Sequence, residues 1–253
     1  MKKQSSRKTK GLTKEQEKIE ESDIDTAKSK KTLTKKAKDT NKKTKTLKKK
    51  EIDLLKYEKK LYKQGIKFIC GVDEVGRGPL VGPVVTACVI LPEKFDLEGL
   101  TDSKKLSEKK REILYKEIEE QALGIGIGIV DNEEIDNINI LNATKKAMKM
   151  AIDNCNVRPE HVLIDAVKLD IDIPTTSIIK GDLKSITISA ASVIAKVTRD
   201  HMLYELDKKY PMYDFKHNKG YPTKKHIEAI MEYGIIKEHR KSFSPVKEYV
   251  NNK

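Results

Sequence analysis

The sequence contains few cysteines, and they form no recognisable metal or disulfide pattern. Cys70, Cys88 and Cys155 are the three in the chain, and no CxxC or Cys/His cluster surrounds them. The pattern therefore indicates neither a zinc site nor a disulfide framework. Cys70 and Cys88 lie within apolar stretches, where we expect them to be small buried side chains.

Long apolar runs are also missing. No stretch approaches the ~20 residues that cross a membrane. The N-terminal residues lack the apolar core of a signal peptide. We therefore expect a protein that does not bind membranes and that works in a reducing, cytoplasmic compartment. We also expect it to be a monomer.

Residues 1–50 lack aromatic side chains and carry almost all of the net charge. They contain 19 Lys and Arg against 7 Asp and Glu, a surplus of 12, within a chain of 253 residues and net charge +13. Such a segment cannot bury enough apolar surface to offset the entropy of ordering its backbone, so we predict a disordered tail. The tail could bind nucleic acid through counterion release or be a dispensable extension, and the sequence favours neither interpretation.

From residue 51 onward the pattern changes to alternating predicted helices and strands. We expect an N-terminal helix or linker over residues 51–66, and one folded domain with a C-terminal helical part over residues 67–253. This mixture predicts an α/β domain with a partly antiparallel sheet. The expected strands cover about residues 68–74, 83–91, 123–130, 161–165 and 177–180, and the expected helices about residues 51–63, 107–121, 139–154, 184–209 and 223–233. The strand at 123–130 (LGIGIGIV) alternates glycine with isoleucine, which leaves one face without side chains.

Residues 71–83 (GVDEVGRGPLVGP) carry the strongest functional signal in the chain. An apolar run delivers Asp73 and Glu74 to a strand end, and a glycine-flanked arginine turn at residues 76–79 follows at once. Acidic groups beside such a turn suggest a metal next to a site that admits a phosphodiester backbone. An ordinary polar hairpin turn is the alternative for this segment taken alone.

Two further acids follow apolar strands, and the four carboxylates together predict a metal centre. Asp165 ends the strand at 161–165, and Asp182 follows a glycine. If the strands ending at Asp73 and Asp165 run parallel, these acids lie about one strand spacing apart, ~4.8 Å. Two carboxylates at ~4 Å repel by roughly 4 kcal/mol at an effective dielectric near 20, which Mg²⁺ or Mn²⁺ would relieve. Taken alone, Asp165 is more typical of a cap and Asp182 of a turn.

Five blocks in order along the chain resemble bacterial ribonuclease HII. They are GVDEVGRGPLVGPVV at 71–85, DSKKLSEKKRE at 102–112, VLIDAVKL at 162–169, KGDLKSITISAASVIAKVTRDHM at 180–202 and HNKGYPTKKH at 217–226. The resemblance implies a ribonuclease H-like mixed five-stranded sheet with flanking helices. It also implies a Mn²⁺- or Mg²⁺-dependent endonuclease that cuts RNA in RNA–DNA hybrids. Such an enzyme incises duplex DNA 5′ of single embedded ribonucleotides by two-metal hydrolysis, leaving 5′-phosphate and 3′-hydroxyl ends.

The resemblance also assigns residues. It makes Asp73, Glu74, Asp165 and Asp182 the catalytic and metal-binding acids. The elements that would recognise the ribose 2′-hydroxyl and the adjacent sugar are Gly76, Arg77, Gly78 and Tyr221. Residues suited to phosphate contacts are Ser103, Lys104, Lys105, Asn142 and Lys145.

Two alternatives remain at this point. Ribonuclease HIII, a sister family, has its last acid four residues after the third aspartate, where this chain has Leu169. That family also carries a folded N-terminal domain, for which the composition of residues 1–50 is unsuitable. The second alternative is a non-catalytic RNA–DNA hybrid binding protein, which would be expected to have lost part of the acidic set.

Overall fold

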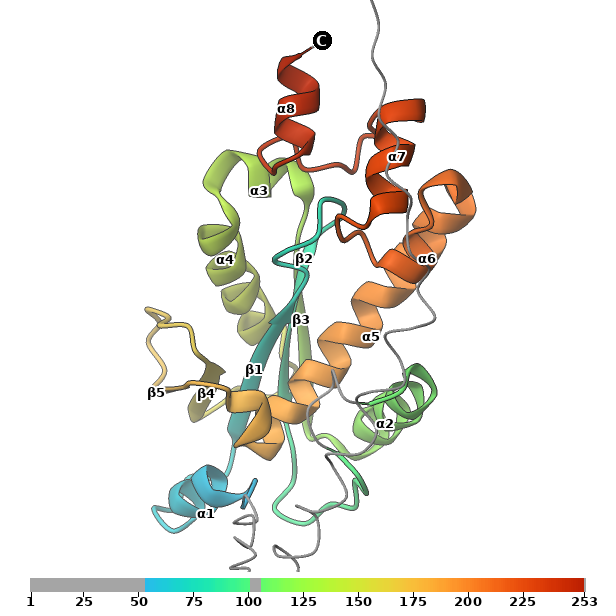
Figure 1. The fold of residues 1–253 in the computed structure, drawn as a ribbon. Coiled ribbons are helices and arrows are strands. Elements are labelled where there is room, and N and C mark those ends of the chain that lie inside the picture. The colour runs from blue at the N-terminus through green and yellow to red at the C-terminus, as the bar shows by residue number, and fades with distance from the viewer. Residues whose placement is uncertain (1–52, 101–105, 253) are drawn as a thin grey trace, which may run out of the picture. The chain divides into compact units, whose positions relative to one another are not determined.

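A computed structural model describes residues 53–100 and 106–252. The predictions for residues 1–50 and for Ser103, Lys104 and Lys105 therefore fall outside the described residues and stay predictions. Within the described ranges, the chain forms a mixed sheet with helices on both faces and a helical C-terminal part (Figure 1).

The sheet has five strands in the order β3-β2-β1-β4-β5. β1 pairs antiparallel with β2 and parallel with β4, while β2–β3 is antiparallel and β4–β5 parallel. The predicted α/β class with a partly antiparallel sheet is therefore confirmed. The strands are β1 (Ile69–Val75), β2 (Val84–Ile90), β3 (Gly124–Val130), β4 (His161–Asp165) and β5 (Thr175–Ile178).

The helices agree with most of the predicted ranges. The Ser107 side chain caps the second helix by accepting from the Lys110 amide, as its position before an amphipathic run suggests. None of the helices in the described ranges is apolar and long enough to span a bilayer. The helices are α1 (Lys56–Tyr62), α2 (Glu108–Gln121), α3 (Asn132–Ile138), α4 (Ile140–Asp153), α5 (Ile186–Lys209), α6 (Phe215–Asn218), α7 (Lys224–Tyr233) and α8 (Val246–Asn251), with 3₁₀ turns at Gly181–Leu183 and Pro211–Tyr213.

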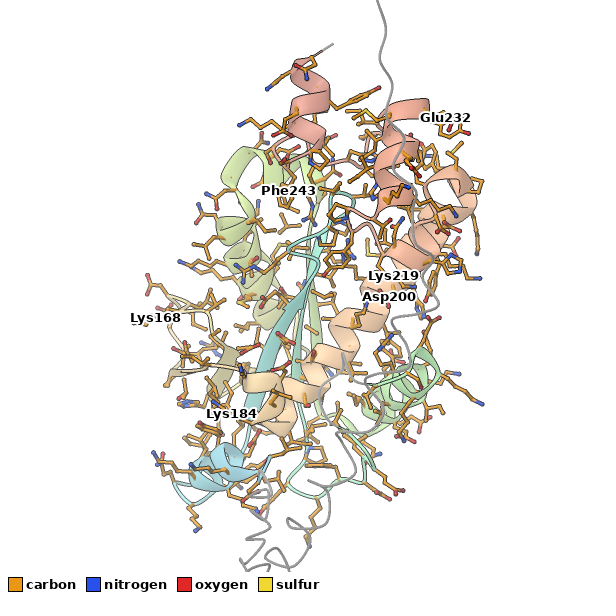
Figure 2. All side chains as sticks on the ribbon, viewed as in Figure 1. Lys168, Lys184, Asp200, Lys219, Glu232 and Phe243 are labelled. Atoms are coloured by element: carbon orange, nitrogen blue, oxygen red, sulfur yellow. A yellow bond between two sulfur atoms is a disulfide. The ribbon has the colours of Figure 1, made fainter. Side chains whose placement is uncertain are left out.

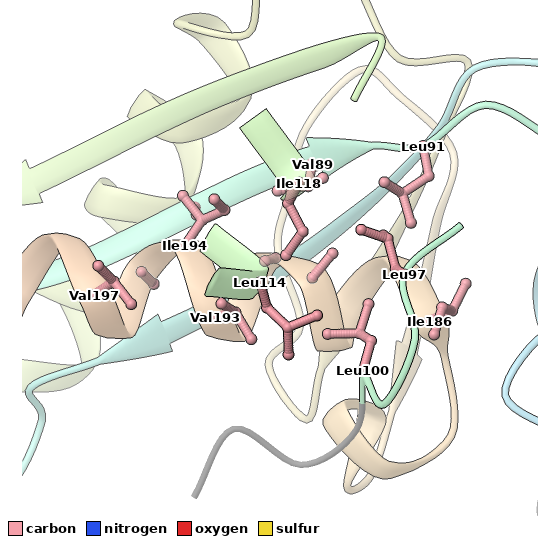
Figure 3. Packing of buried hydrophobic residues seen from close by; sticks show 14 residues of the cluster. Val89, Leu91, Leu97, Leu100, Leu114, Ile118, Ile186, Val193, Ile194 and Val197 are labelled. Carbon is pink, nitrogen blue, oxygen red and sulfur yellow. The ribbon is translucent and has the colours of Figure 1, made fainter. Parts of the chain in front are cut away.

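Alternate residues of β2 show how the two faces of the sheet are covered. Ala87 and Val89 belong to the apolar cluster built with α2 and α5 (Figure 3). Cys88 and Ile90, which point to the other face, pack with Met148 and other residues of α4. Helices therefore cover both faces, and every residue of β2 is buried.

Glycines let the helices lie directly on the strands. A Cβ atom added at Gly71 of β1 would lie 2.1 Å from the carbonyl carbon of Thr187 at the start of α5. One added at Gly126 or Gly128 of β3 would lie 2.0 or 1.9 Å from a carbonyl oxygen of α4. The bare face predicted for residues 123–130 is therefore the face on which α4 packs.

Several elements differ from the sequence predictions. β5 covers residues 175–178 rather than 177–180, because its pairing with β4 fixes its register. The short helices α3, α6 and α8 were not among the predicted ranges. Short helices have weak periodicity and depend on tertiary contacts, here on apolar clusters that include Ile135 and Val246.

The cysteines require a correction. The structure pairs the sulfur atoms of Cys70 and Cys88 as a disulfide between β1 and β2, with their Cα atoms 6.0 Å apart, and leaves Cys155 free. Cys70 pairs with Ile90 and Cys88 with Val72, so the two cysteines are diagonal neighbours on one face of the sheet. Their spacing of 18 residues along the chain gives no sign of this proximity, although their predicted burial is confirmed.

Gly128→Ala is expected to destabilise the fold by about 3 kcal/mol, because the new methyl group would overlap the Ala147 carbonyl oxygen of α4. The matched control is Ile129→Ala on the same strand, whose side chain is 39% exposed and should cost about 1 kcal/mol or less. Urea unfolding followed by circular dichroism measures both. Equal losses for the two variants would contradict the close packing of α4 on β3.

Candidate active site

Asp73 and Asp165 lie at the same edge of the sheet. β1 and β4 run parallel with Val72 opposite Ile164, so the next residue on each strand is one of these acids. We expected Asp73 and Asp165 to lie close together if their strands ran parallel. This pairing confirms the parallel arrangement. Asp73 is only 5% exposed.

Asp73 faces α5. Residues 69, 71 and 73 alternate onto the face where Gly71 meets the first turn of that helix. The Ser192 side chain of α5 forms a hydrogen bond with the Asp73 carboxyl group, and the Glu74 amide donates to Asp73 Oδ1 at 2.8 Å. The sequence analysis did not predict this contact.

The electrostatic environment of Asp73 disfavours its charge. Burial raises the pKa of the Asp73 carboxyl well above its usual value, and the neighbouring Glu74 and Asp165 raise it further. The hydrogen bond from Ser192 acts in the opposite direction but does not cancel these effects. A carboxylate held in such surroundings is stabilised by any cation that binds next to it.

Glu74 has one paired and one unpaired oxygen. Arg77 Nη1 lies 3.3 Å from Glu74 Oε1, while Oε2 is buried and has no hydrogen-bond partner. Burial raises the pKa of Glu74 and Asp165 adds to the increase, although Arg77 opposes both. An unpaired buried carboxylate oxygen beside two other acids has the donor chemistry that hard divalent cations bind.

Asp165 and Asp182 are joined through the backbone between them. The Gly181 amide donates to Asp165 Oδ1 at 2.7 Å. Asp182 follows in the 3₁₀ turn, is 5% exposed, and accepts a hydrogen bond from Ser189 Oγ of α5 at its carbonyl oxygen. The structure therefore holds the turn that carries Asp182 against the end of β4 and the first turns of α5.

The four acids fit a hard divalent cation in donor chemistry. All supply carboxylate oxygens, the pKa values of Asp73 and Glu74 are raised, and Glu74 Oε2 lacks a partner. With the side chains as they are placed in residues 53–100 and 106–252, no three His, Cys, Asp or Glu groups form a ready-made metal cage. Glu74 is turned toward Arg77, and Asp165 toward the Gly181 amide.

The glycine–arginine–glycine turn lies next to Tyr221. Gly76 has φ = 94°, and a Cβ atom there would lie 2.3 Å from Nε of Arg199. A Cβ atom at Gly78 would lie 3.3 Å from Cε1 of Tyr221, whose side chain is 47% exposed. Gly78 and Tyr221 lie 143 positions apart in the sequence, and together they form one surface close to the acidic residues.

Asn142 and Lys145 lie on the first turns of α4. Asn142 is exposed, and its side-chain amide donates to the Ile138 carbonyl oxygen at 3.0 Å. Both residues line a cavity of about 390 Å³ with further lysines, among them Lys168 in the segment after β4 (Figure 2). Four lysines outnumber two aspartates, Asp153 and Asp170, in the lining, so the cavity carries a net positive charge that suits phosphate contacts.

Sequence reasoning missed two buried arginines near the turn. Arg199 of α5 and Arg240, which lies between α7 and α8, are both fully buried and donate to backbone carbonyl oxygens of residues 76–83. Arg199 stands within a block that resembles ribonuclease HII, but nothing in the sequence indicates that its side chain points inward. An arginine that donates only to main-chain oxygens has no acidic side chain as a partner. The sequence therefore contains no signal that would predict its burial.

A mixed sheet with carboxylates at the ends of two parallel strands matches the fold and the donor set of metal-dependent nucleases of the ribonuclease H type. The comparisons with known proteins make the assignment specific. The model of the ribonuclease HII family matches residues 70–246, and the chain belongs to this family. Members are metal-dependent endonucleases that hydrolyse phosphodiester bonds in the RNA of RNA–DNA hybrids.

Curated relatives agree with the family assignment. Ribonuclease HII of Bacillus cytotoxicus is 62% identical over 191 residues, covering 76% of this chain and 74% of the relative. Ribonuclease HII of Bacillus cereus is 60% identical over 188 residues, covering 74% and 73%. The prediction of a bacterial ribonuclease HII is therefore confirmed over the alternative of ribonuclease HIII.

Solved structures support the same fold. Ribonuclease H2 from Pyrococcus horikoshii aligns with a TM-score of 0.63 at 26% identity, covering 73% of this chain and 97% of that one. Ribonuclease HII from Archaeoglobus fulgidus, solved in complex with PCNA, gives 0.59 at 25% identity, covering 70% and 95%. A Bst-RNase HIII complex with Mn²⁺ gives 0.54 at 17% identity, covering 74% and 70%, and shows the fold alone.

Asp73→Asn is expected to leave the metal-free protein as stable as the wild type or more stable, because it removes a buried charge that Glu74 and Asp165 repel. The folded-state pKa of Asp73 lies above its unfolded value of about 3.8. The folded state therefore binds more protons, and this contribution favours folding increasingly as the pH falls through the folded pKa. Asp73→Asn should lack this pH-dependent contribution to the free energy of unfolding.

Urea unfolding in EDTA at pH 8 and pH 5 measures both effects, with the exposed Asp172→Asn as the matched control. A clear fall in the free energy of unfolding of Asp73→Asn at pH 8 would contradict the strained acidic cluster.

Proposed function

We propose that this ribonuclease HII incises duplex DNA 5′ of a single embedded ribonucleotide, in addition to cutting RNA–DNA hybrids, and leaves 5′-phosphate and 3′-hydroxyl ends. The observation that carries this proposal is the closeness of the glycine–arginine–glycine turn to Tyr221, since a Cβ atom at Gly78, four residues after Glu74, would lie 3.3 Å from Cε1 of the tyrosine ring. A surface for one sugar next to a cluster of acids suits recognition of one ribose, not of a long strand.

Asp73, Glu74, Asp165 and Asp182 would hold the divalent metal, Mn²⁺ or Mg²⁺. Bound there, two metal ions would supply an activated water and stabilise the leaving oxygen. The residues of the chain have separate tasks in this proposal. Ser192 orients the Asp73 carboxyl group, and the Gly181 amide orients that of Asp165. Arg77 pairs with Oε1 of Glu74, so Oε2 is the oxygen through which Glu74 would hold a cation.

The ribose would be recognised by the turn at residues 76–78. Glycines at positions 76 and 78 leave the backbone open to a sugar, and a 2′-hydroxyl can both donate and accept a hydrogen bond there. Tyr221 would pack against the adjacent deoxyribose, since nearly half of its side chain is exposed beside Gly78.

Phosphate contacts would extend from this surface. Asn142 and Lys145 lie exposed or half-buried along one cavity with other basic side chains. Ser103 and Lys104, and with them Lys105, are proposed for the same task on the resemblance alone. We also propose that the enzyme acts as a cytoplasmic monomer.

The incision test uses a duplex that carries one ribonucleotide and is labelled at its 5′ end. With Mg²⁺ or Mn²⁺ we expect one cut directly 5′ of the ribose, and none in EDTA. Asp73→Asn and Asp165→Asn should each lower the rate by at least about a thousandfold, since each would remove a ligand of the reacting metals. Tight binding without any cut would support a non-catalytic hybrid-binding protein and contradict the proposal.

A deletion of residues 1–50 tests the basic tail separately. If the tail binds nucleic acid, the deletion should flatten the dependence of log Kd on log salt while the position of the cut stays the same. Fluorescence anisotropy with the labelled duplex between 50 and about 200 mM salt measures the slope. An unchanged slope would favour the dispensable extension.

A further inference from the structure

Arg240 holds the turn that contains the glycine–arginine–glycine element. Its side chain donates to three carbonyl oxygens, those of Gly76 at 2.6 Å, Arg77 at 3.1 Å and Gly82 at 2.8 and 3.0 Å. The side chain is fully buried and lies under the ring of Phe243, 4.9 Å from its centroid (Phe243 is labelled in Figure 2). No substrate could touch it, but it determines where the backbone of the turn lies.

His239, the preceding residue, is linked to Tyr221 through His226. The Ile236 amide donates to His239 Nδ1 at 2.9 Å, so the proton of a neutral His239 must be on Nε2. That nitrogen lies 3.2 Å from His226 Nε2, and His226 Nδ1 donates to the Tyr221 carbonyl oxygen at 2.9 Å. Each hydrogen bond determines which nitrogen of the next histidine carries the proton. This row of hydrogen bonds therefore has one consistent set of proton positions.

The two histidines are held neutral by their surroundings. Burial lowers the pKa of His239 to about 3, with His226 adding to the decrease, and burial also lowers the pKa of His226. Tyr213 and Phe215 pack around both histidine rings, with ring centroids 5.3 to 6.3 Å from those of the histidines. The chain of hydrogen bonds from the Ile236 amide to Tyr221 is thus intact at neutral pH.

The backbone of this segment binds the same elements. The Arg240 amide donates to the Leu80 carbonyl oxygen, and the Gly82 amide donates to that of Glu238. The Leu80 amide in turn donates to the Gly220 carbonyl oxygen, next to Tyr221. Residues 236–240 are therefore hydrogen-bonded on one side to the turn that contains the glycine–arginine–glycine element. On the other side they are linked through His226 to the segment that contains Tyr221.

We propose that Arg240 and His239 are positioning residues that set the distance between the turn at residues 76–78 and Tyr221, and so determine discrimination between a ribonucleotide and a deoxyribonucleotide. The inference rests on the proposed function of that turn and of Tyr221. A shift of the turn away from the tyrosine would weaken the contacts that depend on the 2′-hydroxyl. Contacts to the phosphate backbone, which Asn142 and Lys145 would make elsewhere, would remain.

The residue types support a positioning role. Planar guanidinium groups present several donors in fixed directions, whereas a lysine ammonium cannot reach three carbonyl oxygens in this arrangement. Burial and the neighbouring Arg199 lower the pKa of Arg240 to about 9, so Arg240 is still a cation at neutral pH. Arg240→Lys is a conservative replacement that removes the planar fork of donors holding the carbonyl oxygens of Gly76, Arg77 and Gly82.

The test measures two constants for each protein in Mg²⁺. One is KM for a duplex with a single ribonucleotide, and the other is Ki for the same duplex made entirely of DNA, used as a competitor that is not cut. The ratio of Ki to KM reports discrimination for the ribose. For Arg240→Lys we expect KM to rise about tenfold and Ki to stay within about twofold, so that the ratio falls about tenfold, or roughly 1.4 kcal/mol.

His239→Asn is the second variant, because its amide oxygen can still accept from the Ile236 amide while the contact with His226 is lost. It should lower the ratio by roughly threefold, since the Arg240 contacts remain. The matched control is Lys237→Gln in the same segment, whose side chain is 80% exposed and lies 3.7 Å from Glu133. Its ratio should equal that of the wild type.

The outcomes separate this inference from the function on which it rests. A wild type with a ratio near one would refute ribose recognition itself. A discriminating wild type whose ratio persists in Arg240→Lys and His239→Asn, with only kcat or the folded fraction reduced, would show that these residues support the fold alone. Failure of both variants to fold, checked by circular dichroism, would lead to the same rejection.

Discussion

The mutual repulsion of carboxylates at the ends of β1 and β4 is the constraint around which this structure is organised. Parallel pairing of the two strands brings Asp73 and Asp165 to one edge, and burial of Asp73 raises the cost of its charge beside Glu74 and Asp165. The rest of the fold must supply enough apolar burial to tolerate that cost. Both faces of the sheet are covered by helices, and β2 is buried along its whole length.

Local patterns were sufficient to predict the part of the site that lies at strand ends. Apolar runs that stop at Asp73 and Asp165 define strands and place polar groups at their termini, and Ser107 marks the helix that follows. The glycine–isoleucine alternation likewise predicted the strand on which α4 packs. These signals depend on side-chain periodicity, which acts over a few residues and can be read from one segment at a time.

Contacts between distant segments were not predictable in the same way. Arg240 binds main-chain oxygens about 160 positions earlier in the chain, and any residue type there would offer the same oxygens. Cys70 and Cys88 meet because of the register between β1 and β2, which their sequence spacing does not specify. The link from His239 to Tyr221 depends on tautomers that only the neighbouring donors determine.

The close contact between β1 and α5 at Gly71 has a consequence for how this enzyme tolerates mutation. Main-chain atoms, not side chains, set the separation of helix and strand there, so no nearby rotamer can enlarge or reduce it. Ser192 is carried on the same helix, about one and a half turns further along, and Asp73 on the same strand. Sequence drift in the surrounding apolar clusters should therefore leave the serine–aspartate geometry unchanged, whereas replacement of this one glycine should disturb it.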